Sequence, residues 1–122
     1  MKKFVAAKQT LSTLLSDYPQ ISAKGGDEIR RYLGIVGTTS PLFSINKTFA
    51  DLRDSADDIV EFTEAATDFD RALRGADGQA YSSNFVEFSA SKGTKEDYYA
   101  SAKVDIVEMD KFMKVMAKEL GV

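Results

Sequence analysis

The sequence predicts an all-α protein, an antiparallel (up-down-up-down) four-helix bundle with an extra short helix or irregular segment before the last helix. Apolar residues recur at steps of three and four through nearly the whole chain, which is the period of one helix face. Only two prolines, Pro19 and Pro41, interrupt the 122 residues, and no long segment alternates with the two-residue period of a strand. This length suits one domain, so we assign residues 1–122 to a single helical bundle.

The first two helices are expected over about residues 3–18 and 26–36. Pro19 ends the first helix, because proline lacks the N–H group that a helix interior needs. Asp27 and Glu28 begin the second helix, where acidic side chains complement the helix dipole. The apolar positions of the two segments are Phe4, Ala7, Leu11, Leu14, Tyr18, Ile29, Leu33 and Val36.

The third helix is expected over residues 41–74. Ser40 is a favoured N-cap, Pro41 is a favoured first helical residue, and Gly75 closes the segment. A single helix of this span would be about 50 Å long at 1.5 Å per residue. That exceeds most helices in single domains, so a kink near Ser55 stays open. The apolar stripe is Leu42, Ile45, Phe49, Leu52, Ala56, Ile59, Phe62, Ala66, Phe69 and Leu73.

Two more segments complete the expected bundle. Tyr81, Phe85 and Phe88 allow a short helix over residues 79–89. The last helix is expected over residues 95–120, because Thr94 and Asp97 resemble a capping box at its start. Its apolar stripe is Tyr99, Ala102, Ile106, Met109, Met113, Met116 and Leu120.

These stripes predict the core. Its methionines could instead form an adaptable peptide-binding groove, but their spacing favours core filling. The residues expected inside are Leu11, Leu14, Leu33, Phe49, Leu52, Ile59, Phe69, Ile106, Met109 and Met113.

The composition argues against catalysis. The chain contains no cysteine and no histidine, which removes the thiolate and imidazole nucleophiles and the usual ligands of zinc, copper and haem. A Ser-Lys pair is the remaining nucleophile, and no glycine-rich segment matches a phosphate loop. We therefore expect no enzymatic activity, no cofactor and no metal. The longest apolar runs are far shorter than the ~20 residues that span a bilayer.

Charge is unevenly placed along the chain. Residues 1–50 carry seven basic and three acidic side chains, whereas residues 51–70 carry eight acids and only Arg53. Five of those acids fall at steps of three or four. Such a row could bind calcium or a pair of transition metals. It lies opposite the apolar stripe, however, so we expect it to face solvent or a partner. The five acids are Asp54, Asp57, Glu61, Glu64 and Asp68.

A row of lysines follows the last helix. Such a row could bind nucleic acid, but interspersed acids and a sequence pI near 5.0 argue for an ordinary charged surface, and we expect no nucleic-acid partner. The row is Lys103, Lys111, Lys114 and Lys118.

Several short stretches resemble a known family. Residues 25–34 read GGDEIRRYLG, residues 36–42 read VGTTSPL and residues 56–63 read ADDIVEFT. These stretches, with the Tyr98-Tyr99 pair near the start of the last helix, are similar to PsbQ-like extrinsic proteins of photosystem II, of the diatom or red-lineage type. The likeness covers most of residues 25–120 in pattern.

The resemblance implies a non-catalytic, four-helix subunit on the lumenal side of the chloroplast thylakoid membrane, peripheral and not embedded. Such subunits bind the photosystem II core and other extrinsic subunits. They shield the manganese–calcium cluster and help to retain its calcium and chloride. This chain would then be a mature form without its targeting segments, and a monomer in isolation.

The family does not indicate which residues dock, so the candidates come from charge and exposure. Adjacent residues are about 100° apart on a helix, so at least one of Arg30 and Arg31 should escape the apolar seam. The main rival function is a helical adaptor or chaperone-like protein that grips a partner helix with its methionine-rich end. The partner-binding candidates are Arg30, Arg31, Tyr32, Tyr98, Lys103, Lys111, Lys114 and Lys118.

Overall fold

A computed structural model describes residues 1–86 and 93–122, and this part of the chain is all-helical, without a strand. The α-helices are α1 (Lys2–Ser16), α2 (Tyr18–Ser22), α3 (Gly26–Tyr32), α4 (Ile45–Leu52), α5 (Ile59–Ser83) and α6 (Lys95–Leu120). A 3-10 turn, η1 (Arg53–Ser55), separates α4 from α5.

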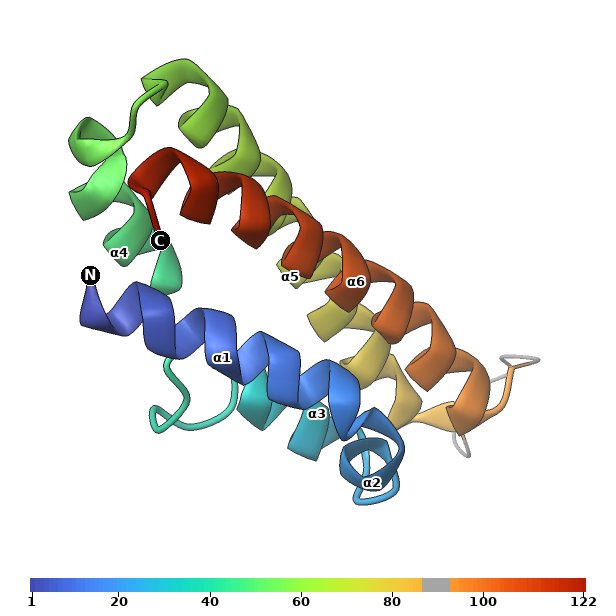
Figure 1. The fold of residues 1–122 in the computed structure, drawn as a ribbon. Coiled ribbons are helices and arrows are strands. Elements are labelled where there is room, and N and C mark those ends of the chain that lie inside the picture. The colour runs from blue at the N-terminus through green and yellow to red at the C-terminus, as the bar shows by residue number, and fades with distance from the viewer. Residues whose placement is uncertain (87–92) are drawn as a thin grey trace.

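The longest helices, α5 and α6, form an antiparallel hairpin that runs the length of the molecule (Figure 1). Helix α1 lies along α6, and α3 and α4 contact both α1 and α5. Both chain ends lie at the end of the molecule that holds α4, and the last turn of α5 and the first turn of α6 lie at the other end (Figure 1). The core is the space that these helices enclose.

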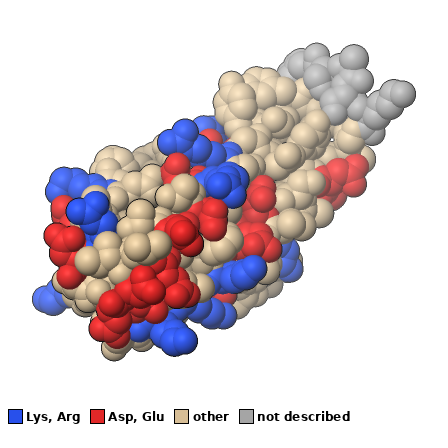
Figure 2. Space-filling model, turned by 90° about the horizontal axis from the view of Figure 1, so that it is seen from above, with Lys and Arg blue, Asp and Glu red and all other residues tan. Residues whose placement is uncertain are grey.

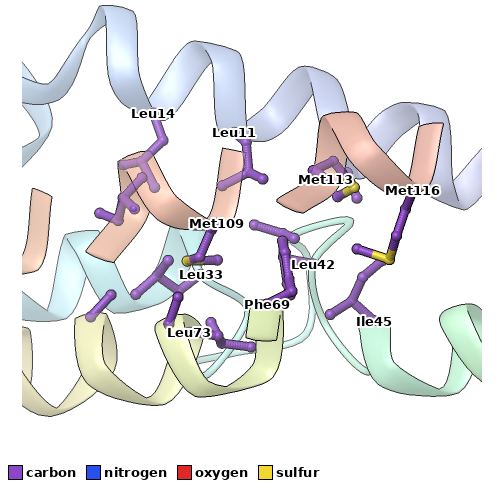
Figure 3. Packing of buried hydrophobic residues seen from close by; sticks show 14 of the residues in the cluster. Leu11, Leu14, Leu33, Leu42, Ile45, Phe69, Leu73, Met109, Met113 and Met116 are labelled. Atoms are coloured by element: carbon purple, nitrogen blue, oxygen red, sulfur yellow. The ribbon is translucent and has the colours of Figure 1, made fainter. Parts of the chain in front are cut away.

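Most of the predicted core is confirmed, as Figure 3 shows for side chains from α1, α5 and α6 and for Leu33, which directly follows α3. Two residues were predicted wrongly: Leu52 is only partly buried and Ile59 is exposed. Both flank the break between α4 and α5, where the helical phase restarts. The confirmed residues are Leu11, Leu14, Leu33, Phe49, Phe69, Ile106, Met109 and Met113.

The prediction of one helix over residues 41–74 is wrong. The chain turns over residues 41–44 before α4 begins, and Ser40 Oγ donates to the carbonyl of Tyr32 instead of capping a helix. After η1, Ala56 is extended, with φ −75° and ψ 144°. The break includes Ser55, near which the sequence allows a kink.

Hydrogen bonds from the last turn of α6 explain this break. The backbone N–H of Asp57 donates to the Glu119 carbonyl at 2.9 Å, and the N–H of Asp58 donates to the Glu119 carboxylate at 2.8 Å. Asp58 then caps α5 by accepting from the N–H of Glu61 at 3.0 Å. These contacts satisfy the backbone groups that an interrupted helix leaves unpaired.

Other predicted boundaries shift as well. The first helix ends at Ser16, and Pro19 lies in the first turn of α2, where its missing N–H has no partner to lose. Helix α3 ends at Tyr32, before the residue 36 expected, and Gly34 follows with φ +81°. The predicted capping box at Thr94 and Asp97 is confirmed.

The predicted short helix over residues 79–89 is not a separate element where it can be described. Residues 79–83 are the end of α5, and Phe88 lies outside the described residues. Gly75, predicted as a terminator, lies inside α5. A Cβ at Gly75 would lie 2.6 Å from Asp105 Oδ2, so this glycine lets α6 place a carboxylate close to α5.

Replacing Asp105 by asparagine should stabilise the protein near neutral pH. Burial, followed by repulsion from Glu108, raises the pKa of the Asp105 carboxyl. The folded state therefore disfavours the charged form above the ordinary pKa, and wild type regains this stability as pH falls through the raised pKa. Thermal unfolding should show a higher Tm for Asp105→Asn at pH 7, and this difference should shrink as pH falls through the raised pKa toward about 4, the ordinary pKa of aspartate. An equal or lower Tm at pH 7 would contradict this account.

Candidate docking surfaces

Arg30 is held inside the molecule. Its Nε donates to Asp77 Oδ1 at 2.7 Å, and its Nη1 donates to Asp27 Oδ1 at 3.2 Å. The guanidinium also lies 4.9 Å from the centre of the Tyr81 ring, and its side chain is only 18% exposed. A hydrogen bond from Asn84, followed by that from Arg30, lowers the pKa of Asp27. Arg30 therefore joins α3 to α5 and has little surface left for a partner.

The approach of α3 to α5 that makes this network depends on Gly26. Gly26 is the first residue of α3 and is buried against the end of α5. A Cβ there would overlap the carbonyl oxygen of Ala80 and the hydroxyl of Ser83. Only glycine lets the two backbones come this close.

Arg31 and Tyr32 line a shallow hollow. Its volume is about 300 Å³, and Thr39 and Pro41 form its other wall. Arg31 is 52% exposed, and its Nε donates to Glu28 at 3.4 Å. The two adjacent arginines thus have different environments, and Arg31 is the more accessible of the pair.

The four predicted lysines of α6 are all exposed. Lys111 lies 3.9 Å from Glu108, and Lys114 pairs with Asp110 at 2.9 Å. Lys103 lies 5.8 Å from the centre of the Tyr18 ring. Within the described ranges, Lys103 and Lys118 form no ion pair. This row is therefore the most accessible positive surface among the candidates.

The tyrosines near the start of α6 have structural contacts. Tyr98 is half-buried, with its ring beside Gly93. The hydroxyl of the buried Tyr18 donates to the carbonyl of Tyr99, which fastens α2 to α6. Burial, followed by the neighbouring Tyr99, raises the pKa of Tyr18 to about 12. Ionisation of Tyr18 is thus opposed by the fold.

The acidic row, which runs from η1 into the first half of α5, faces solvent for most of its length. Asp54, Asp57, Glu61 and Glu64 are exposed, and Asp68 is half-buried. No three acidic side chains of residues 1–86 and 93–122 gather as a potential metal site. No helix in those ranges is long and apolar enough to cross a membrane. On the face shown in Figure 2, charged side chains of both signs crowd one end of the molecule, and uncharged atoms predominate toward the other end.

Sequence reasoning missed two exposed apolar residues on α6. Val104 is 64% exposed and Val107 is 50% exposed. They share a stripe with three of the lysines, because positions 104, 107, 111, 114 and 118 follow steps of three and four. The sequence contains this spacing, but the apolar residues of α6 were assigned only along the core-facing stripe.

Comparisons with protein families, with curated proteins and with solved structures gave no match to this chain.

Proposed function

We propose that this protein is a non-catalytic extrinsic subunit that binds the lumenal face of photosystem II. It would support oxygen evolution by stabilising the environment of the manganese cluster and by helping to retain calcium and chloride. Its partners would be the photosystem II core and other extrinsic subunits, in the chloroplast thylakoid lumen. The proposal starts from the PsbQ-like stretches of the sequence, and the arrangement of the described helices supports it.

The fold is compatible with an antiparallel four-helix bundle in which two short helices, α3 and α4, together take the place of the second helix. Helices α3 and α4 both lie between α1 and α5, and α5 and α6 pack along their lengths. The chain passes along α1, returns through α3 and α4, and then forms the α5–α6 hairpin (Figure 1). We therefore interpret the architecture as up-down-up-down, with the loop of residues 33–44 interrupting the second helix.

The resembling stretches have structural roles in this arrangement. Gly26 allows α3 to approach α5, and a Cβ at Gly34 would overlap the backbone of Leu42 and Phe43. Asp58 begins α5. We infer that these stretches define the architecture, and that docking depends on other, exposed residues.

The observation that carries the docking proposal is the exposed lysine row of α6. The Arg30 side chain is only 18% exposed, whereas those of Lys111 and Lys114 are 67% and 68% exposed. We therefore assign the electrostatic attraction mainly to the row and, secondarily, to Arg31. The rival adaptor function has less support, because Met109, Met113 and Met116 are fully buried. A groove built from them would require the core to open.

Reversing the lysine row should weaken binding to photosystem II. The triple variant Lys111→Glu, Lys114→Glu and Lys118→Glu places acids where an acidic partner surface would face them, and we expect binding to salt-washed photosystem II membranes to weaken at least tenfold. Raised salt should release wild type, because exposed charges are screened over about 8 Å at physiological ionic strength. Pelleting measures binding, and oxygen release measures the functional effect.

Lys2→Glu and Lys24→Glu together provide the control, since both lysines are exposed and lie outside α6. Circular dichroism must show the same helical signal for all variants. If folded wild type does not bind these membranes at low salt, the photosystem proposal is wrong. If wild type binds and the triple variant binds equally well, the α6 row is not the docking surface.

A further inference from the structure

Helix α6 carries two apolar stripes instead of one. The first faces the core, with Ala102, Ile106 and Met109 fully buried. The second contains Val104 and Val107, displaced by two positions and hence by about 200° around the helix. Neither valine belongs to the core cluster. The two valines thus form a small apolar patch on the side of α6 that faces away from the core.

The valines have no explanation within the described chain. Valine is a weaker helix former than lysine, glutamate or alanine, because its branched side chain loses rotamer freedom. Burial normally offsets this cost, but Val104 and Val107 remain 64% and 50% exposed. Single exposed apolar residues are common, whereas these two lie one turn apart and continue into a lysine row.

The charge around the valines identifies the partner's chemistry. Lys103 is adjacent to Val104, and Lys111, Lys114 and Lys118 continue the stripe toward the end of α6. Lys111 and Lys114 pair with the acids Glu108 and Asp110 of the same helix, but their side chains stay 67% and 68% exposed. Lys118 forms no ion pair among the described residues. The face is thus apolar in its first half and presents exposed cationic groups in its second, which complements a surface with apolar and then acidic side chains.

The geometry of α6 also restricts the shape of the partner. The backbone groups of a helix interior are bonded within the helix, so a partner strand cannot add to it through backbone hydrogen bonds. Recognition must occur between side chains along a narrow stripe about 21 Å long, from position 104 to position 118. A second helix presents side chains with the same period and suits such a stripe.

We infer that Val104, Val107, Lys111, Lys114 and Lys118 form one docking face for an acidic amphipathic helix of a partner protein. An apolar side chain of that helix packs against the valines, and its carboxylates lie over the lysines. This inference deepens the proposed function by naming the class of partner surface. It rests on that proposal only where the partner is taken to be part of photosystem II.

The first test uses a synthetic peptide of about four helical turns, with leucine along one stripe and glutamate beside it. We expect full-length wild type to bind this peptide and to ignore a counterpart with lysine in place of glutamate. The variant Val104→Thr, Val107→Thr keeps the shape and the branching of both side chains. It should bind about tenfold more weakly, with an unchanged dependence on salt, because only apolar contact is lost.

The matched control is Val5→Thr, Val60→Thr, which changes two exposed valines on α1 and α5 and should bind as wild type does. Lys111→Gln, Lys114→Gln and Lys118→Gln should instead flatten the salt dependence. If wild type does not bind the acidic peptide, or if the Val104→Thr, Val107→Thr variant binds it as tightly as wild type, the inference is wrong.

Two further measurements separate the possible partners. Binding to salt-washed photosystem II membranes should be weakened in the Val104→Thr, Val107→Thr variant and unchanged in the control. Binding of wild type to the peptide but not to these membranes would support the docking face and overturn the photosystem proposal. Protein-free vesicles of anionic phospholipid should not bind wild type. The inference is wrong, and the face contacts lipid, if wild type binds the vesicles, the Val104→Thr, Val107→Thr variant does not, and wild type does not bind the peptide.

Discussion

Replacing Phe49 by alanine should lower the free energy of unfolding by about 3–5 kcal/mol. The Phe49 side chain is buried where α4 meets the core, and its ring packs edge-on against three others. The ring centres lie 6.1 Å from Phe4, 6.5 Å from Phe62 and 5.1 Å from Phe69. Alanine would remove the apolar contact of the whole cluster and leave a cavity between helices from distant parts of the chain.

A loss of this size is a large fraction of the ~5–15 kcal/mol that stabilises a typical domain. Urea unfolding followed by circular dichroism measures it, with the slope of the transition as a check on two-state behaviour. The control is Phe43→Ala, because Phe43 is exposed, lies outside the core cluster and has the Lys3 ammonium 5.8 Å from the centre of its ring. This change should cost less than about 1 kcal/mol. Similar losses in the two variants would contradict the assignment of Phe49 to the centre of the core.

Replacing Gly26 by alanine should also destabilise the protein, by about 1–3 kcal/mol or more. The added methyl group would overlap the backbone carbonyl of Ala80, which is fixed within α5 and cannot rotate away. Helix α3 would have to move outward. This movement would also stretch the hydrogen bond between Arg30 and Asp77.

Gly78→Ala is the matched comparison, since a Cβ at Gly78 meets nothing within 4 Å. Alanine should stabilise α5 there by about 0.5–1 kcal/mol through its higher helix propensity. Thermal unfolding should therefore shift in opposite directions for the two glycine-to-alanine variants. A Gly26→Ala protein as stable as wild type would show that α3 and α5 are not in this close contact.

Features set by neighbouring residues were predictable from the sequence. The capping box of Thr94 and Asp97 depends on four consecutive positions, and the core stripe of α6 repeats regularly from Ala102 onward. The exposure of the α6 lysines follows from the same period. These predictions needed no knowledge of which helices pack together.

Features set by distant residues were not predictable. The apolar steps of three and four continue through residues 53–58, so the sequence pattern concealed the break that Glu119 stabilises from the end of α6. The role of Arg30 depends on Asp77, 47 positions away. Spacing alone placed Arg30 and Arg31 together as docking candidates, whereas packing of α3 on α5 gives them different environments.

Helix α4 packs less extensively on the rest of the protein than α5 and α6 pack on each other, so the native protein should open first at α4. Helix α4 is short, follows a turn, and is joined to α5 through η1 and an extended residue. An open groove of about 310 Å³ lies between it and α5, whereas α5 and α6 pack continuously. The amide hydrogens of α4 should therefore exchange with solvent through local opening, while those in the middle of α5 and α6 wait for global unfolding. Local opening should therefore report on α4, and global unfolding on α5 and α6.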